Sequence, residues 1–349
     1  MSRGNYDEGS EPGRCRLGGF ACSPAVGSSS PSPVLAKLST STAAFSPSPT
    51  SPLCSGTPAV ENSSGSEGRQ MWRLDDFELG PCIGSGAFGR LLLVRERCSG
   101  AVAVLKAMKK RRIERLRVRR HVAHEIKIQG HLRHPNILRL FGFFWDSTRI
   151  YTILEHAAGG DLDSLMRAQP GQHFGEESVA HYIKQAASAI EYCHRVHVIH
   201  RDLKPQNVLL ARKGRVKLAD FGWAVHTFPD QRRWTLCGTL DYLAPEIVHA
   251  ANGHSFGVDV WGLGVLAYEL LVGQPPFASP AQEETYRRIL EATPTFPDGL
   301  SGGARDLVGR LLQRDPEERL PPGEVVVHPW VRHNEGGAGE GRIAAFAGA

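Results

Sequence analysis

The chain has 349 residues, of which 41% are apolar and 22% charged, and a formal net charge of +5. This length allows a large core in two lobes, and so mild a charge does not indicate a nucleic-acid-binding protein. The seven cysteines form no C-x-x-C pair, so we expect reduced intracellular thiols rather than disulfides or a zinc site. No leader-like run and no apolar stretch of about 18 residues is present, so we expect neither secretion nor a membrane span.

Residues 1–71 are rich in Ser, Pro, Gly and Thr, and they cannot bury enough apolar surface to offset their chain entropy. We expect a disordered N-terminal tail there and a flexible Gly/Ala-rich tail over 333–349. The N-terminal tail contains candidate sites for proline-directed kinases, although Ser-Pro pairs are also common in linkers. These sites are Ser23, Ser30, Ser32, Ser46, Ser48, Ser51 and Thr57.

The ordered domain is expected over 77–331, beginning with an antiparallel sheet between Phe77 and Lys106, where apolar segments alternate with turn residues. From about Ile113 to Leu132 the apolar residues recur at helical spacing, and Glu125 lies on their inward-facing stripe. A buried carboxylate is costly unless it is paired, so Lys106 is its expected partner.

From Glu177 onward the spacing is mainly helical, and the run from Asp259 to Leu271 is apolar on nearly every face. Such a run predicts a helix buried in a large lobe. The fold class is therefore expected to be α+β, with a small antiparallel sheet lobe that carries one main helix and a larger, mostly helical lobe.

Short motifs follow one another in a fixed order along this domain. They are Gly84–Gly89 (G-S-G-A-F-G), Lys106, Glu125, His200-Arg201-Asp202 with Asn207, Asp220-Phe221-Gly222 and Ala244-Pro245-Glu246. This order is the signature of protein kinases. A lone G-x-G-x-x-G also occurs in dinucleotide-binding folds, but strand-like sequence follows it here and favours a hairpin that covers a nucleotide.

The motifs predict the roles of the catalytic residues. Asp202 would accept the proton of the substrate hydroxyl, and Lys204 would neutralise charge on the γ-phosphoryl group. Asn207 and Asp220 supply oxygen ligands suited to Mg²⁺. A structural role exists for each residue alone, such as a turn at Asp202, but does not explain their joint spacing. The Asp-Leu-Lys-Pro run is similar to that of kinases acting on serine and threonine.

The nucleotide site is expected to draw on the glycine-rich hairpin, the lysine strand, the hinge between the lobes and the catalytic loop. Lys106, held by Glu125, would contact the α- and β-phosphates. The alternative, a solvated surface lysine, is disfavoured because the strand around it is apolar. The expected nucleotide-binding residues are Ile83, Gly84, Ser85, Gly86, Ala87, Phe88, Gly89, Leu91, Ala103, Lys106, Leu154, Glu155, Ala157, Gln206, Asn207, Leu209 and Asp220.

The segment between Asp220 and Glu246 resembles the Aurora family of mitotic serine/threonine kinases. Trp223 follows the Asp-Phe-Gly motif, and Thr235–Leu243 reads T-L-C-G-T-L-D-Y-L. The resemblance covers residues 72–332, including the L-R-H-P-N-I-L-R-L run from Leu132.

By this resemblance, Thr235 would be an activating phosphorylation site whose phosphate pairs with Arg201. Arg232 and Arg233 precede it, which implies a preference for basic residues upstream of the target, with Asp161 as one acceptor. The sequence departs from the family pattern at two positions, of which the first weakens the expected preference and the second has no physical explanation. Gln206 replaces an expected glutamate, and Trp234 replaces a small residue.

The resemblance further implies ATP and Mg²⁺ as cofactors, histone H3-like and spindle or chromosome proteins as substrates, and a role in chromosome segregation. It implies a nuclear and cytoplasmic protein, at the spindle, centrosome or centromere in mitosis. An activating partner segment would wrap the small lobe and face the basic stretch Lys109–Arg120, although a solvated helix face also explains those charges. No membrane and no direct nucleic-acid partner is expected.

Two alternatives remain. One is a kinase of a cyclic-nucleotide-type or Polo-type group, against which Trp223 and the T-L-C-G run argue. The other is a pseudokinase scaffold that uses its fold and tail only for binding. The intact Lys106, Asp202, Asn207 and Asp220 argue against the scaffold.

Overall fold

The computed structural model describes residues 72–85, 89–228, 230–235, 237–249 and 253–334. The predictions for the N-terminal tail 1–71 and for residues 335–349 therefore lie outside the described residues. Within the described residues, no helix has the length and apolar character that a membrane crossing requires.

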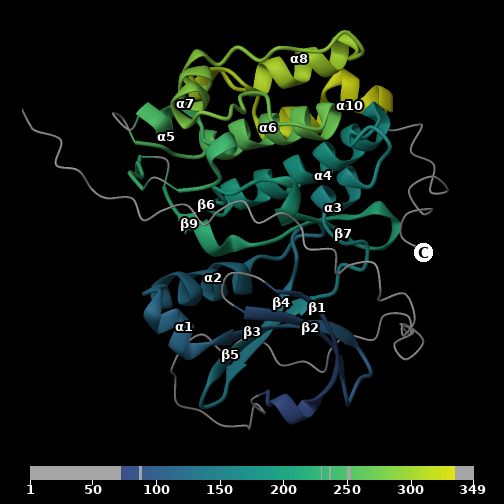
Figure 1. The fold of residues 1–349 in the computed structure, drawn as a ribbon, viewed down its shortest axis with the longest axis vertical. Helices are drawn as coiled ribbons and strands as arrows, with labels where there is room; N and C mark the ends of the chain where they lie inside the picture. Colours follow the sequence, from purple (N-terminus) through teal and green to yellow (C-terminus); the bar gives the residue numbers. More distant parts are fainter. Residues whose placement is uncertain (1–71, 86–88, 229, 236, 250–252, 335–349) are drawn as a thin grey trace, which may run out of the picture. The chain divides into compact units, whose positions relative to one another are not determined.

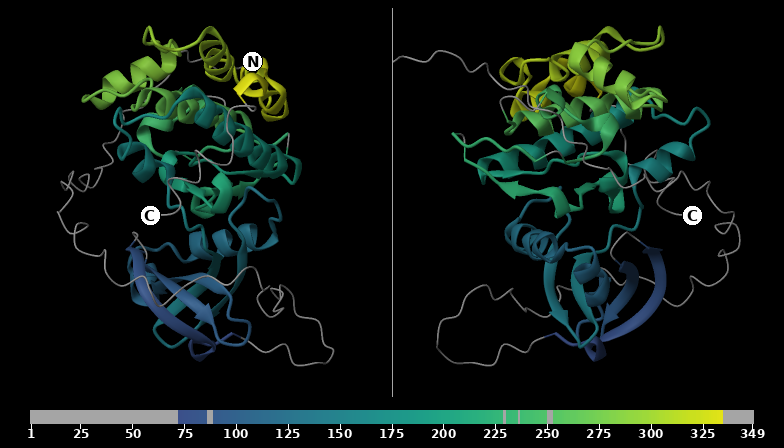
Figure 2. Two further views of the ribbon diagram at one scale, coloured as in Figure 1. Left: turned by 90° about the vertical axis from the view of Figure 1, so that its right-hand side faces the viewer. Right: turned by 60° about the vertical axis from the view of Figure 1, so that its left-hand side comes forward.

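The small lobe is built on a five-stranded antiparallel sheet with the strand order β1-β2-β3-β5-β4. Figure 2 shows the twist of this sheet from two directions. A short 3-10 turn, Leu74–Asp76, precedes it. The strands are β1 (Phe77–Ser85), β2 (Gly89–Glu96), β3 (Val102–Lys109), β4 (Leu140–Trp145) and β5 (Arg149–Glu155).

The predicted helix of the small lobe is divided in the structure. Helix α1 covers Lys110–Arg115 and α2 covers Arg119–His131. Between them Arg117 has φ +54°, a left-handed conformation that ends a helix. The spacing of apolar residues carries no information about this backbone angle, so it did not reveal the break. Helix α2 packs against β4 on one side and against β9 (Val225–His226) on the other (Figure 1).

The large lobe is mainly helical, as the sequence indicates. Its α-helices are α3 (Leu162–Arg167), α4 (Glu176–Arg195), α5 (Pro245–His249), α6 (Gly257–Val272), α7 (Gln282–Glu291), α8 (Gly302–Leu311), α9 (Pro322–Val327) and α10 (Pro329–Asn334). Its short strands form two antiparallel pairs, β6 (Val198–Ile199) with β9, and β7 (Val208–Leu210) with β8 (Val216–Leu218). Short 3-10 turns occur at Pro205–Asn207, Arg212–Gly214, Phe221–Trp223, Leu240–Tyr242 and Pro316–Glu318.

The core of the large lobe surrounds α6. Every residue from Val258 to Leu271 is buried, which confirms the prediction of a helix apolar on nearly every face. Helix α4 packs beside it and buries Val179, Ile183 and Ile190, as the helical spacing predicts. The structure thus has the predicted fold class, an antiparallel sheet lobe and a helical lobe, and the large core holds the segments that carry the catalytic motifs.

Candidate active site

An ion pair joins β3 to α2. The Lys106 Nζ lies 2.6 Å from the Glu125 Oε1, and both side chains are largely buried. Burial disfavours the charged ammonium, but the carboxylates of Glu125 and Asp220 outweigh it and raise the pKa of Lys106 above its usual value. The lysine expected to meet phosphate is therefore positively charged, and its acidic neighbours hold it in place.

Several of the residues expected to bind the nucleotide form one apolar cluster. Leu91, Leu154, Ala157 and Leu209 belong to one cluster, together with Val104. These residues come from β2, β3, β5 and β7 and from the chain just after β5, so the fold brings together residues that are far apart in the sequence.

The structure corrects the prediction for Ala103. Side chains alternate between the faces of a strand, so Ala103 and Lys106 point to opposite faces of β3. Ala103 packs with Phe77 and Phe144 in the core of the sheet, whereas Val104 lies on the same face as the lysine. Val104, two positions before the lysine, is therefore the residue of β3 that we now expect to face the nucleotide.

The described part of the glycine-rich hairpin includes Ile83, Gly84, Ser85 and Gly89, while residues 86–88 lie outside the described residues. Ile83 is half exposed. At Gly89 a Cβ atom would lie 2.1 Å from the carbonyl oxygen of Ala107, so no larger residue fits against β3 there.

The hinge residue Glu155 turns its side chain away from the site. Its carboxylate forms an ion pair of 2.7 Å with Lys217 and accepts a hydrogen bond from the backbone N–H of Arg139. The backbone N–H of Glu155 donates to the carbonyl of Arg139 at 2.9 Å, so contact of its backbone carbonyl with a nucleotide stays a prediction.

Asp202 lies at the centre of a hydrogen-bond network. Its carboxylate is 2.8 Å from the Lys204 Nζ and accepts hydrogen bonds from Asn207 Nδ2 (2.9 Å) and from Thr239 Oγ1 (2.9 Å). The Lys204 ammonium also donates to Thr239 Oγ1 at 2.9 Å. The predicted base and the predicted cation are therefore neighbours, and Thr239 connects them.

Thr239 was not singled out from the sequence. It stands 37 residues after Asp202, in the G-T-L run that belongs to the family resemblance. Its hydroxyl is the only donor that the activation segment gives to this network among the residues that the structure describes. The sequence shows a threonine beside a glycine at this position, but no local pattern predicts that its hydroxyl contacts Asp202.

Asn207 and Asp220 suit a metal that prefers oxygen ligands. The Asn207 amide nitrogen is used by Asp202, which leaves its oxygen for another partner. Asp220 has φ +59° and accepts a long bond, 3.3 Å, from the Gly222 N–H, so its carboxylate keeps coordination capacity. The described residues contain no group of three His, Cys, Asp or Glu side chains that would form an all-protein metal cage. Two protein ligands are typical of Mg²⁺ bound together with phosphates.

A fully buried carboxylate holds the catalytic loop. Asp259, near the start of α6, accepts the backbone N–H groups of His200 (2.9 Å) and Arg201 (2.8 Å). It also bonds to His194 at 2.9 Å. Burial alone would raise the pKa of Asp259, but His194, His200 and these donors lower it, so the carboxylate is charged. This loop needs the support because Arg201 has φ +68°, an unfavourable backbone conformation for a residue other than glycine.

Phe221 follows Asp220 and lies completely buried against the ring of His200, with 4.8 Å between the ring centroids. Helix α2 packs against Phe221–Trp223. The Asp-Phe-Gly segment is thus fixed on one side by the catalytic loop and on the other by the helix that carries Glu125.

The activation segment presents Thr235 to solvent, between the exposed Trp234 and the buried Cys237. Arg201 donates from its Nε to the carbonyl of Trp223 at 2.8 Å. No hydrogen bond joins Thr235 to Arg201 among the described residues, so their pairing remains a prediction for the phosphorylated chain.

Glu246 and Arg319 form a bidentate ion pair, with distances of 2.7 and 2.8 Å. The Arg319 side chain is fully buried and lies over the ring of Trp261. This buried pair therefore joins α5 to the chain that follows α8.

Comparison with known proteins identifies the fold and the family. Residues 77–331 match the protein kinase domain family. The chain is 48% identical over 276 residues to an Aurora kinase of Patiria pectinifera, covering 79% of this chain and 67% of that protein. It is 47% identical over 272 residues to Aurora kinase B of Mus musculus, covering 78% of each. It is 43% identical over 286 residues to the serine/threonine-protein kinase Aurora-1 of Arabidopsis thaliana, covering 81% of this chain and 96% of that protein. The chain belongs to the Aurora family of serine/threonine protein kinases.

Proposed function

We propose that this kinase is active and transfers the γ-phosphoryl group of ATP to serine and threonine residues of mitotic proteins, histone H3 among them. The observation that carries the proposal is the pair of contacts made by Asp202 to Lys204 and Thr239. A scaffold needs no such network, whereas proton transfer from a substrate hydroxyl needs a carboxylate held in a fixed orientation.

In the proposed reaction, Asp202 accepts the proton of the attacking hydroxyl. Lys204 is close enough to that carboxylate to reach the transferring phosphoryl group and to stabilise its charge. Lys106 holds the α- and β-phosphates in line, and Glu125 fixes the lysine. Each residue thus orients or neutralises a group that changes charge during transfer.

Asn207 and Asp220 would hold Mg²⁺, which supplies positive charge to the phosphate oxygens. The apolar cluster of Val104, Leu91 and Leu209 would enclose the adenine ring and exclude water from the phosphates. The glycine-rich hairpin would cover them.

Phosphorylation of Thr235 would activate the enzyme by ordering the activation segment against Arg201. Selection of basic residues upstream of the target is less strongly supported. Asp161 caps α3 by accepting from both the N–H and the hydroxyl of Ser164, and the exposed Gln206 carries no charge. We therefore propose a weak rather than strict preference for upstream arginine.

A groove on the small lobe would receive the activating partner segment. It is a cavity of about 430 Å³ between α2 and strands β4 and β5, with an apolar floor that includes Val122, Ile126 and Phe143. Lys110 and Arg119 lie at its edge, so a segment with apolar anchors and acidic flanks would fit. The family likeness supports action at the spindle, the centrosome or the centromere.

The test is transfer from Mg-ATP to a histone H3 tail peptide by the intact chain and by two variants. Asp202→Ala is expected to lower kcat by roughly 10²–10⁴-fold because it removes the base. Thr235→Ala is expected to lower it roughly 5–150-fold through lost ordering of the segment. Asp306→Ala, at a half-exposed position on α8, is the control and keeps full activity. Absence of transfer by the intact chain, with Thr235 phosphorylated and a partner segment supplied, would instead favour a scaffold.

A further inference from the structure

A groove lined by basic side chains lies beside the hinge, on the loop that leads from α2 to β4. It is a cavity of about 440 Å³ whose walls include Arg133, His134, Arg139, Glu155 and Lys217, and we call it the basic groove. The loop carries the L-R-H-P-N-I-L-R-L run, which has no part in the proposed phosphoryl transfer.

The charges of the basic groove are not balanced. Among the lining residues that the structure describes, Glu155 is the only carboxylate, and Lys217 already engages it at 2.7 Å. No carboxylate of a described residue forms an ion pair with Arg133 or Arg139. Arg133 donates to a backbone carbonyl at 2.9 Å, and the Arg139 guanidinium lies 5.3 Å from the centroid of the Phe141 ring. Both guanidiniums are therefore placed by uncharged groups and keep their full charge.

The positive groups lie close enough to affect one another. Burial, and after it the charge of Arg139, lowers the pKa of Arg133. Burial and nearby positive charges also lower the pKa of His134, and of the acidic groups only Glu191 opposes this shift. An anion that entered the basic groove would relieve this repulsion.

The N-terminal tail joins the kinase domain beside this groove. Trp72 is the first described residue, and it packs together with Phe141 against the same buried cluster of the sheet. A Cβ atom on Gly142 would lie 3.4 Å from the Trp72 ring. Phe141 lines the basic groove and lies under Arg139. The 71 residues that precede Trp72 therefore start next to the strand that forms one wall of the groove.

The part of the tail nearest to the domain has the complementary charge. No basic residue stands at positions 38–68, where the only charged residues are Glu61 and Glu67. The residues between these glutamates are Asn, Ser and Gly, whose small side chains allow the backbone to approach a surface closely. This stretch thus offers two carboxylates for two unpaired guanidiniums.

The chain lengths permit both contacts. Glu67 is five residues from the first described residue, a reach of at most about 18 Å, and Arg139 is three residues from Gly142, at most about 11 Å of chain. Glu61 is eleven residues from the same starting point, a reach of at most about 40 Å. Arg133 is nine residues from Gly142, at most about 32 Å of chain. The order of the glutamates along the tail thus matches the order of the arginines along the loop.

We propose that residues 61–67 of the tail dock in the basic groove. Glu67 would pair with Arg139. Glu61 would pair with Arg133, six residues earlier in the loop. Ion pairs at such exposed positions are individually weak. The tether, however, gives the segment an effective concentration on the order of millimolar, so a weak contact is still populated.

Docking would order a short part of a tail whose composition predicts disorder, and it would hold that part next to the hinge. The contact does not depend on the proposed phosphoryl transfer, and its test needs no measurement of activity.

The experiment measures backbone order in the isotope-labelled full chain by NMR relaxation. At low ionic strength, the amides of residues 61–67 are expected to have order parameters above about 0.6 in wild type. In Arg133→Ala/Arg139→Ala they are expected to fall below about 0.6, as in a flexible chain. The same loss is expected in wild type at about 1 M salt, where the Debye length is about 3 Å. Arg332→Ala, at an exposed position on α10, is the control and keeps the wild-type values.

An exchange of charges identifies the occupant of the groove. Glu67→Arg and Arg139→Glu are each expected to release the segment, whereas the two substitutions together restore its order. Urea midpoints equal to that of the control show that these variants are folded.

Three results would overturn the proposal. The first is an order parameter below about 0.6 over residues 61–67 in wild type at low ionic strength. The second is order that Arg133→Ala/Arg139→Ala leaves unchanged. The third is order that each single substitution removes and the exchanged pair does not restore, in which case the groove is open to an acidic segment of another protein. An inactive enzyme would contradict the proposed function and leave this test intact.

Discussion

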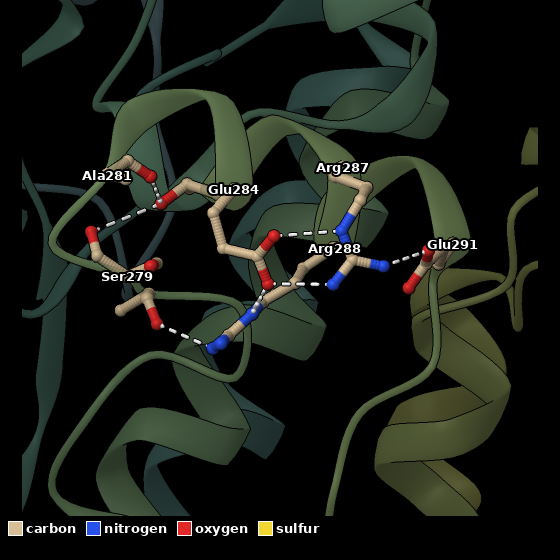
Figure 3. Close-up of polar contacts among 8 residues, drawn as sticks. Ser279, Ala281, Glu284, Arg287, Arg288 and Glu291 are labelled. Carbon is tan, nitrogen blue, oxygen red and sulfur yellow. Dashed lines mark hydrogen bonds and ion pairs between the residues drawn. The ribbon is translucent and has the colours of Figure 1, made fainter.

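Two groups of ion pairs in the large lobe show the same chemistry in opposite surroundings. Arg319 and Glu246 are joined at 2.7 Å, and the exposed fraction of the arginine side chain is 0%. On α7, Arg287 binds Glu284 at 2.8 Å and also contacts Glu291, but 58% of the arginine side chain is exposed (Figure 3). Arg288 joins the same glutamate at 2.7 Å. The distances are nearly equal, but the buried pair contributes to the stability of the core, whereas water solvates and screens the charges of the exposed network.

The largest difference in stability between the two groups is expected when one partner of the buried pair is removed. Arg319→Ala leaves the Glu246 carboxylate uncompensated and removes the cation over Trp261, so the free energy of unfolding is expected to fall by about 3–5 kcal/mol. Urea denaturation measures it. Arg310→Ala is the matched control, since Arg310 pairs with Asp306 but is 58% exposed, and it is expected to cost less than about 1 kcal/mol. Equal losses in the two variants would contradict the assignment of the energetic difference to burial.

A second prediction concerns a hydroxyl in the catalytic network. Thr239→Val keeps the side-chain shape but removes the hydroxyl that links Lys204 to Asp202, so kcat is expected to fall roughly ten- to hundredfold. The urea midpoint is expected to stay unchanged, because Thr239 is only partly buried and valine keeps its shape. Thr239→Ser restores the hydroxyl and should recover most of the rate. If Thr239→Val were fully active, this hydroxyl would have no role in orienting Asp202.

The smallest effect is expected on α7. Its two arginines lower the pKa of Glu284 to about 2, so the carboxylate stays charged throughout the range from pH 5 to 8 and brings no pH dependence there. Glu284→Gln is expected to leave the urea midpoint unchanged at about 0.15 M salt, since the network is exposed and screened. A shift as large as that of Arg319→Ala would mean that the exposed network carries stability after all.

The sequence predicted the fold and most of the site because the kinase motifs are local. Lys106, Asp202, Asn207 and Asp220 are recognised from their immediate neighbours, and the structure brings them together. Glu125 was found because a carboxylate on an apolar stripe requires a partner. The buried face of α6 was equally visible in its composition.

What the sequence did not reveal depends on long-range contacts or on backbone geometry. Asp259 supports the catalytic loop across 58 and 59 positions, and no local pattern links it to His200 and Arg201. The break between α1 and α2 depends on the left-handed Arg117, which apolar spacing does not report. Ala103 was misplaced by one residue, and in a strand one residue exchanges the faces.

The contacts of Asp259 also decide how the catalytic loop moves. A loop is usually the part of a protein that opens most easily, but the amide protons of His200 and Arg201 are bonded to a carboxylate inside the most deeply buried helix. Releasing them would leave the fully buried Asp259 carboxylate without two of its donors, which is costly. The chemical centre of this kinase therefore resists the local opening that loops usually undergo.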